Sequence, residues 1–439
     1  MVNQVVGRDR FIFWLIILQP IIDLITSISN QFSGFPLSIG ALSRALLMAF
    51  LFIYISYYLI RKKQKLLILF IASFTVILIT MVVNVFFKEN FAWFEEINFI
   101  IKTSYYLVMI YLSIILIENR ILSKALILQS TKIVSLIIGV SYWLAIITGT
   151  SINSYSYINK GYSGWFYAAN ELSVIVLILL GIMIINLKYD KRLTTWLAFI
   201  FMLSMLPMVG TKTAFFGGLF IVAITVIYLL FTFNLKFWKD KNCLIFLCLI
   251  IIFICFIPLS PITSNTKQLG PVIEQKQPEK KQTTKVEDPI EEERGSAFTK
   301  RLLSSRNVYF QDTKADFVNA GGLRKAFGLG YAGDYKKEEP KVIEMDFLDM
   351  FFSYGVIGTL FLLLPLLYVL KQIMATIFPL NGEKILLIFT LGICFGIAFL
   401  AGHIVFAPSV ITYIAILFIL LGVEKDESQT NSKHYRTSI

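Results

Sequence analysis

Apolar runs of membrane-spanning length fill almost the whole chain, and one polar segment interrupts them. Nine such runs precede residue 261 and three follow residue 344. A helix needs roughly 20 apolar residues to cross the hydrocarbon layer of a bilayer. The pattern therefore predicts an all-α, polytopic membrane protein of about 12 transmembrane helices, with one large extracytoplasmic loop between helices 9 and 10.

The runs divide the chain into four parts. Nine helices are expected in residues 1–260, the loop in 261–344, three helices in 345–422 and a tail in 423–439. The individual spans are predicted at 11–30, 37–60, 66–87, 98–117, 132–148, 165–187, 193–209, 211–233, 242–260, 345–370, 384–402 and 404–422. Pro207 and Gly210 leave open whether the seventh and eighth spans meet in a tight turn or a kink.

Lysine and arginine alternate between successive connections. The even connections are basic, and the second carries Arg61, Lys62, Lys63 and Lys65, whereas the short odd ones carry almost no positive charge. Short cytoplasmic loops are enriched in these residues. We therefore expect a multi-pass protein of the cell membrane with both termini in the cytoplasm and the large loop outside.

The composition is that of a membrane protein and argues against a soluble or nucleic-acid-binding protein. The chain is 57% hydrophobic with a mean hydropathy of +0.73, which is too apolar for a soluble domain of this length. Its net charge of +12 would suggest nucleic acid in a soluble protein, but the basic connections account for that charge, and no nucleic-acid partner is expected. The two histidines are far apart and the cysteines lie in apolar runs, so we expect no metal site and no cofactor.

The large loop has two parts. Residues 261–293 are rich in charged residues, Gln, Thr and Pro, which is typical of a flexible linker. Residues 294–344 carry a helix-like apolar pattern that stops at Gly321 and Gly322, followed by a glycine-rich turn at 327–333. This turn matches the GxGxxG spacing, but no strand pattern precedes it, so a dinucleotide site is not expected. Two interpretations stay open: a tight loop that brings backbone amides close to a substrate, or merely a turn. We expect this second part to hold substrate and catalytic groups.

Ionisable side chains inside the spans gather near the predicted outer face. They are Asp23, Arg44, Lys102, Glu171 and Lys212. Charges are costly in lipid and usually mark pairs or sites. As a set they predict a polar cavity open to the outside. The alternative is that Asp23 and Arg44 form a structural ion pair while the others reach to the interface.

The outer face holds no ATP or nucleotide sugar, so a transfer reaction there needs a donor delivered through the bilayer. A polyprenyl-diphosphate carrier bearing a glycan meets this need. Arginine and lysine can bind its diphosphate, and a carboxylate can take the proton of an acceptor hydroxyl. The loop segment supplies cations at Lys300, Arg301, Arg306, Arg324 and Lys325, and carboxylates at Glu344, Asp346 and Asp349.

Several short motifs resemble the bacterial O-antigen ligase and polymerase superfamily. They read GWFYAANE at 164–171, GTKTA at 210–214, SSR at 304–306, FGLGY at 327–331 and EMDF at 344–347 with YGVIG at 354–358. The resemblance implies a membrane glycosyltransferase that transfers or polymerises a polyprenyl-diphosphate-linked glycan onto a glycan acceptor without a metal. Other polysaccharide-assembly proteins would be further partners.

The predicted site combines residues of these motifs with the ionisable residues inside the predicted spans. The resemblance implies that Lys212 replaces an arginine that recognises the donor diphosphate, and that Arg306 matches the loop arginine of the family. The catalytic candidates are Glu344, Asp346 and Arg306. The candidates for binding diphosphate and glycan are Lys212, Arg301, Arg324, Asn170, Glu171 and Arg44.

One departure from the family pattern guides the choice of product. Glu344 stands near the position where ligases acting on lipopolysaccharide core carry a histidine. This departure argues against ligase activity towards lipopolysaccharide, and the Lys-, Ile- and Asn-rich composition suggests a Gram-positive-type member. Polymerisation of a capsular, teichuronic-type or other cell-surface polysaccharide is then favoured. Three alternatives stay open: a flippase or transporter of lipid-linked oligosaccharide, a ligase that attaches the polymer to another acceptor, and a sensor or scaffold that binds a partner through the loop.

Cysteine labelling in intact cells tests the predicted orientation. A Lys281→Cys variant should react with a membrane-impermeant maleimide, and a Lys63→Cys variant should not, because only residue 281 is expected outside. The wild-type protein gives the background from the native cysteines, and both variants should react in permeabilised cells. Labelling of residue 63 in intact cells would show that the orientation is inverted.

Overall fold

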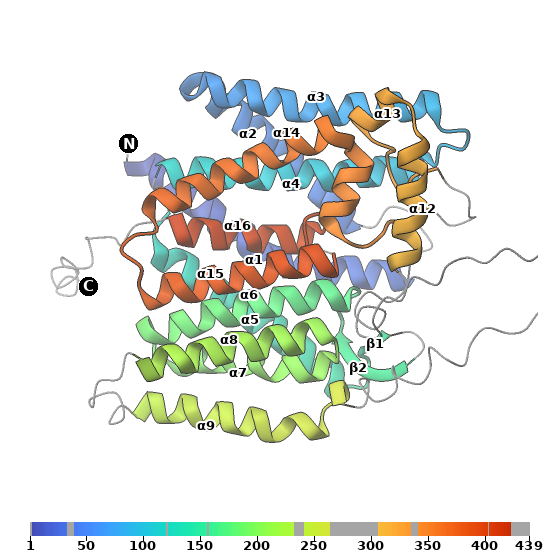
Figure 1. The fold of residues 1–439 in the computed structure, drawn as a ribbon. Helices are drawn as coiled ribbons and strands as arrows, with labels where there is room; N and C mark the ends of the chain where they lie inside the picture. Colours follow the sequence, from blue (N-terminus) through green and yellow to red (C-terminus); the bar gives the residue numbers. More distant parts are fainter. Residues whose placement is uncertain are drawn as a thin grey trace, which may run out of the picture.

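The protein folds as a bundle of helices that run roughly side by side (Figure 1). The computed structural model describes residues 2–32, 39–119, 122–155, 158–231, 241–263, 306–334, 341–402 and 404–422. Nine helices in these ranges are long and apolar enough to cross a membrane, and three shorter apolar helices accompany them. The predicted fold class, an all-α polytopic membrane protein, is confirmed.

The helices before the large loop are α1 (Val2–Phe32), α2 (Ile39–Lys62), α3 (Gln64–Phe87), α4 (Trp93–Asn119), α5 (Lys124–Ile147), α6 (Ala169–Tyr189), α7 (Leu193–Val209), α8 (Lys212–Phe231) and α9 (Lys241–Phe256), which the 3₁₀ turn η1 (Ile257–Leu259) follows. Strands β1 (Ile152–Tyr155) and β2 (Ile158–Gly164) form an antiparallel hairpin between α5 and α6. The later helices are α12 (Arg306–Asn319), α13 (Gly322–Phe327), α14 (Asp346–Thr376), α15 (Gly382–Leu400) and α16 (Pro408–Gly422).

Three helices form the centre of the bundle. In α4 and in α6, 78% of the membrane-length window is buried, against 17% in α2. Helix α16 is buried along its whole length and packs against α4, α6, α14 and α15. Such helices are apolar on all sides. Some of their hydroxyl groups bond within the helix itself: Ser113 in α4 donates to the carbonyl of Met109 at 2.8 Å.

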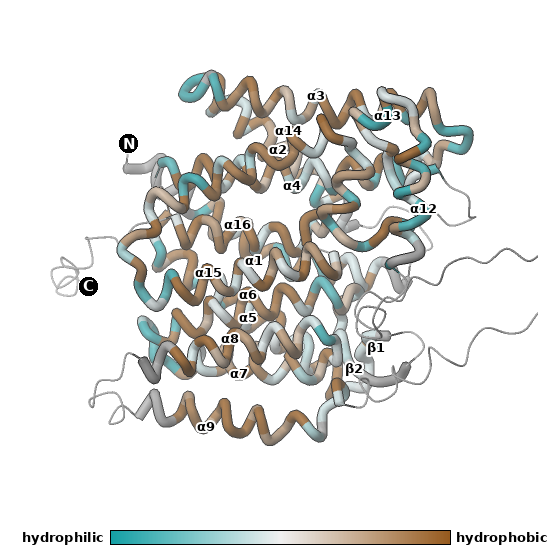
Figure 2. The backbone as a smooth tube through the Cα atoms, viewed as in Figure 1, coloured by the Kyte–Doolittle hydropathy of each residue, from teal (hydrophilic) through white to brown (hydrophobic). Residues whose placement is uncertain are grey.

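The outer helices present large apolar side chains to their surroundings. Ile53 is 68% exposed, Ile68 69% and Phe86 80%. Figure 2 shows that apolar residues run along the helices and that hydrophilic residues collect at both ends of the bundle. Surfaces of this kind are stable in hydrocarbon and aggregate in water. The structure therefore agrees with a chain whose helices are surrounded by lipid.

The hairpin and the two helices of the large loop gather at one end of the bundle, on the right in Figure 1. Within the described residues, four helices, α6 to α9, lie between the hairpin and α12 along the chain. If each of these four helices crosses the membrane, the chain returns to the side from which it started. An alternating topology therefore requires the hairpin and α12 to lie at the same end of the bundle. Which side of the membrane it faces stays a prediction.

Several boundaries differ from those predicted by sequence. Helix α4 begins at Trp93 rather than at residue 98, so Lys102 lies inside the helix and not at its start. Helix α5 begins eight residues before Lys132, because the Ser123 side chain caps it by accepting from the amide of Leu126 at 3.3 Å. The β1–β2 hairpin was not predicted, since its sequence has no long apolar alternation.

The glycine-rich turn of the loop packs directly against a kink in α14. The amide of Leu329 donates to Phe352 O at 2.8 Å. Gly355 interrupts α14 with φ 66° and ψ −171°. A Cβ on Gly328, which has φ 88°, would lie 2.1 Å from Ser353 O. The backbone amides of this turn are thus used for packing, which confirms that it is a tight turn.

Replacing Gly328 tests how strongly this contact stabilises the fold. Gly328→Ala should destabilise the protein by roughly 2–5 kcal/mol, because positive φ and overlap with Ser353 O both oppose a Cβ. Gly321→Ala is the matched control, since its φ is −65° and nothing lies within 4 Å of the new Cβ. Thermal unfolding in detergent measures both. Equal melting temperatures for the two variants would contradict the packing.

Candidate functional site

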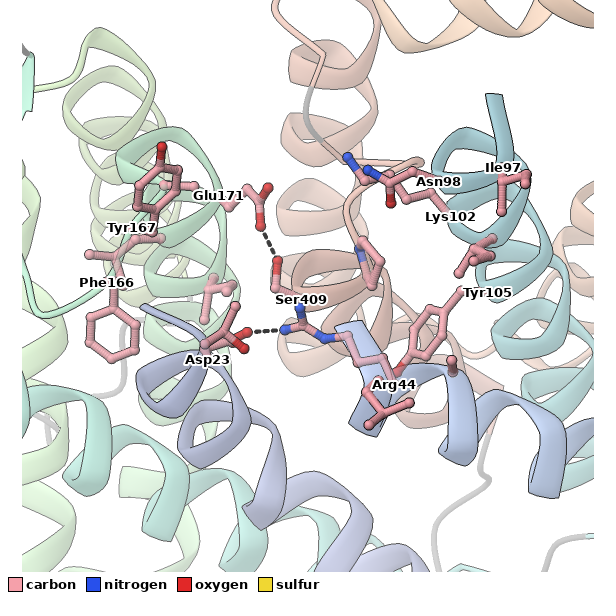
Figure 3. A pocket seen from close by; sticks show the side chains of 18 of the residues that line it. Asp23, Arg44, Ile97, Asn98, Lys102, Tyr105, Phe166, Tyr167, Glu171 and Ser409 are labelled. Atoms are coloured by element: carbon pink, nitrogen blue, oxygen red, sulfur yellow. Dashed lines mark hydrogen bonds and ion pairs between the residues drawn. The ribbon is translucent and has the colours of Figure 1, made fainter. Parts of the chain in front are cut away.

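A cavity of about 650 Å³ lies between α1, α2, α4, α6 and α16. Four of the five charged residues predicted to meet in an outward cavity line it (Figure 3); they are Asp23, Arg44, Lys102 and Glu171. Lys212 is not among its lining residues. The cavity thus joins helices that are far apart in the sequence.

An ion pair between Asp23 of α1 and Arg44 of α2 forms one wall of the cavity. The two side chains are only 15% and 14% exposed. This contact agrees with the alternative of a structural pair. The Nε of Arg44 is also buried and has no hydrogen-bond partner among the described residues. Arg44 therefore keeps donor capacity beyond its bond to Asp23.

The α4 wall carries Asn98, Lys102 and Tyr105. Their spacing of four and three residues puts them on one face of the helix. The Tyr105 hydroxyl lies 3.1 Å from Thr412 Oγ1 of α16, which fixes the ring beside the cavity. The Lys102 ammonium makes no hydrogen bond or ion pair with any residue in the described part of the chain. Lys102 can therefore accept a new anionic partner.

The opposite wall comes from the start of α6 and the start of α16. Glu171 lies in the first turn of α6, and the hydroxyl of Ser409 donates a hydrogen bond to its Oε2. Tyr167, just before α6, is 68% exposed at the edge of the cavity. Figure 3 shows Glu171 and Ser409 facing Asn98 and Lys102 across the cavity.

The predicted Lys212 motif forms the turn between α7 and α8. Gly210 takes φ 75°, and Thr211 caps α8 by accepting from the amide of Ala214 at 3.2 Å. The Thr211 hydroxyl also lies 2.6 Å from Ser173 Oγ in α6. The open question at Gly210 is resolved as a tight turn. Lys212 is exposed beside the first turns of α6, outside the cavity.

A second group of predicted residues meets where the loop enters α14. Arg306 Nη2 lies 3.5 Å from Glu344 Oε2 and 3.3 Å from Ala401 O, and Lys341 Nζ lies 3.0 Å from Glu344 Oε1. Glu344 has φ 64°, which is uncommon for a residue other than glycine. A Cβ on Gly402 would lie 2.6 Å from Glu344 O, so close packing holds this conformation.

The two aspartates at the start of α14 bind backbone amides. Asp346 is 3% exposed, and its Oδ2 accepts from Ile404 N at 2.8 Å and Val405 N at 2.9 Å. Asp349 accepts from the amides of Ile343 and Met345 at 2.8 and 3.0 Å. These bonds join α14 to the segment before it and to the turn between α15 and α16. This geometry suits positioning better than proton transfer.

Arg324 is also occupied within the protein. Its guanidinium binds Asp334 through two nitrogens, at 2.8 and 2.5 Å, and the residue is only 7% exposed. Nearby, Lys88 pairs with Glu96, whose other oxygen accepts from Tyr331 N at 2.9 Å. Burial lowers the pKa of Lys88, and the Glu96 carboxylate opposes that shift. Arg324 thus holds the end of the glycine-rich turn, while Lys88 at the end of α3 and Glu96 of α4 attach the turn to those two helices.

The structure places the predicted site residues in two connected groups. Arg44 and Glu171 line the cavity, while Arg306, Glu344 and Asp346 meet at the loop junction. The α15–α16 turn touches both groups, because Ala401 contacts Arg306 and Ser409 lines the cavity. The candidates outside both groups are Lys212, Arg324 and Asn170, which is exposed beside Glu171. Arg301 lies outside the described residues.

Sequence reasoning missed several cavity residues. Lys102 was noted as a charge but not assigned to the site, and Asn98 and Tyr105 follow from its helical spacing once α4 is known to begin at Trp93. Ser409 carries no signal in the sequence, because a serine in the first turn of a helix is ordinarily read as a capping residue. Its contact with Glu171 depends on how α16 packs against α6.

A model of the family described as O-antigen ligase like membrane protein matches residues 8–427. The match covers both groups of site residues and all helices from α2 to α16. No curated protein sequence matches the chain. The family match confirms the resemblance that the short motifs indicated.

Two substitutions at Asp346 separate positioning from proton transfer. Asp346→Asn keeps an oxygen that can accept from the amides of Ile404 and Val405, so we expect most transfer activity to remain. Asp346→Ala leaves two buried amides unpaired and should cost about 2–5 kcal/mol of stability. Transfer rate and melting temperature should be measured on both. Complete loss of transfer in a folded Asp346→Asn protein would identify Asp346 as the base.

Proposed function

Because the chain belongs to the O-antigen ligase-like membrane proteins, which ligate or polymerise glycans at the membrane, we propose that it transfers a glycan from a polyprenyl-diphosphate carrier. The transfer would take place on the outer face of the cytoplasmic membrane. The observation that carries this proposal is the cavity that brings Arg44 and Lys102 together near one end of the bundle.

The cavity has the size and charge that a lipid-linked donor requires. Its volume of about 650 Å³ lies within the roughly 300–1,000 Å³ of small-molecule sites. Lys102 has no anionic partner in the described part of the chain, and Arg44 keeps a buried Nε without a partner. A diphosphate at headgroup depth would satisfy both groups. The two cations would also stabilise the charge that develops as the diphosphate leaves.

The loop junction is the proposed place for the growing glycan. Arg306 and Glu344 are 17% and 24% exposed, so they can contact sugar hydroxyls without unfolding of the loop. The α15–α16 turn links them to the cavity. We propose that donor sugars leave the cavity towards this junction, where Lys212 and Asn170 would be additional contacts.

The product we propose is a capsular, teichuronic-type or other cell-surface polysaccharide. Two features support this choice over ligation to lipopolysaccharide: the carboxylate at Glu344 and the absence of histidine from the sequence of the loop. The proposed orientation places both termini in the cytoplasm and the loop outside. A glycan acceptor, the bilayer and other assembly proteins are the proposed partners.

Substitution of Lys102 tests the donor site. Lys102→Met should lower the transfer rate of purified protein with a polyprenyl-diphosphate glycan by about 100-fold, the scale of removing one donor aimed at developing charge. Lys371→Met in α14 is the matched control, because this exposed lysine lies outside the cavity and should be neutral. Melting temperatures should stay within a few degrees of wild type. Full transfer activity in Lys102→Met would refute the donor site.

Chelation tests whether a metal is needed. We propose that Lys102 and Arg44 provide the positive charge, so EDTA should leave the transfer rate within about twofold of the untreated protein. The control is a metal-dependent glycosyltransferase treated in parallel. Loss of transfer in EDTA that magnesium restores would show that the charge has been assigned to the wrong groups.

A further inference from the structure

We infer that Glu171 is the general base of the transfer reaction, and that it accepts the proton of the acceptor hydroxyl inside the cavity. This inference rests on the proposed function and assigns a step within it. The base had been expected among the carboxylates of the loop junction. The contacts of each carboxylate near the site point instead to α6.

The other candidate carboxylates are already occupied. Asp23 is paired with Arg44. Glu344 has Lys341 beside one oxygen and Arg306 beside the other. In both cases a neighbouring cation stabilises the ionised carboxylate, which makes it a weaker base for the proton of a substrate hydroxyl. Asp346 and Asp349 are buried and accept from backbone amides, as described above.

Glu171 differs from all four. Among the described residues its partner is one hydroxyl, that of Ser409, and no cation pairs with it. The bond to Ser409 uses Oε2, so Oε1 stays available to a substrate. Glu171 also lines the cavity directly, whereas the loop carboxylates do not. It is therefore a carboxylate that is held in place, open to the cavity and not neutralised.

The position of Glu171 fits a direct displacement. Figure 3 shows it on the side of the cavity opposite Lys102. In such a reaction the nucleophile approaches the carbon from the face opposite the leaving group. With the donor diphosphate at Lys102 and Arg44, the anomeric carbon would lie between the two walls. An acceptor hydroxyl entering from the α6 wall would then reach both that carbon and Glu171.

The step balances without a further reactant. The acceptor O–H bond breaks and its proton passes to the Glu171 carboxylate. The acceptor oxygen forms a bond to the anomeric carbon while the bond from that carbon to the diphosphate oxygen breaks. The electron pair of that bond leaves with the diphosphate, which Lys102 and Arg44 stabilise. General bases of this kind contribute roughly 100- to 10,000-fold to a rate.

Ser409 is a positioning residue in this scheme. It is the second residue of α16, and the amides of Val410 and Ile411 both donate to Ala407 O at 3.0 Å, which fixes this first turn. Its hydroxyl fixes the carboxylate of Glu171 from across the α6–α16 contact. Without it, Glu171 would keep its charge but lose its orientation.

The test separates chemistry from donor binding. Glu171→Gln keeps the size of the side chain and an oxygen that can accept from Ser409, so the protein should fold and bind donor normally. Donor binding is measured as the rise in melting temperature with a polyprenyl-diphosphate glycan. Transfer of the glycan should fall at least 100-fold.

Ser409→Ala should lower transfer about tenfold with donor binding unchanged. Glu89→Gln is the control, since Glu89 is exposed outside the cavity and its loss should be neutral.

Three results would overturn the inference, and they point to different errors. If Glu171→Gln loses donor binding as Lys102→Met does, Glu171 belongs to the donor site and is not the base. If Glu171→Gln transfers at the wild-type rate while Glu344→Gln does not transfer, the base is on the loop. Neither of these two results contradicts the proposed function. If the wild-type protein neither binds nor transfers a polyprenyl-diphosphate glycan, the proposed function fails and this assignment fails with it.

Discussion

The arrangement of the site depends on the carboxylate of Asp346. Its two bonds to the amides of Ile404 and Val405 attach the start of α14 to the α15–α16 turn. One end of that turn meets Arg306, and the other begins the helix that carries Ser409. A charged acceptor for two buried amides is stronger than a neutral one. The loop junction and the cavity are therefore held in a fixed relation by one side chain at the base of the loop.

The cavity is possible because the centre of the bundle is closely packed and this end of it is more open. Helices α4, α6 and α16 bury most of their side chains, so little polar surface is carried into the apolar interior. The charges lie where these helices separate towards α1 and α2. There, Arg44 is balanced by Asp23, while Lys102 has no partner among the described residues. The proposed donor diphosphate would offset the cost of this charge.

The glycine-rich turn has a different role from the one its spacing suggests. Its amides bind carbonyls of α14 and the carboxylate of Glu96, and Arg324 holds it through Asp334. These contacts leave no amide of Leu329, Gly330 or Tyr331 for a phosphate. The turn attaches the loop helices to α3 and α14, and it acts on the site by holding the loop junction in place.

The sequence by itself determined the membrane class, the order of the helices and the family, because apolar length and short motifs are local properties of the chain. It also indicated that Asp23, Arg44, Lys102, Glu171 and Lys212 would converge, since charges in lipid must find partners, and all but Lys212 line the cavity. Tertiary structure decided which carboxylates are occupied and which is open. Asp346 and Glu171 look alike in sequence, but one is enclosed by the α15–α16 turn and the other faces the cavity. That difference comes from how helices distant in the sequence pack together, and no local sequence pattern predicts it.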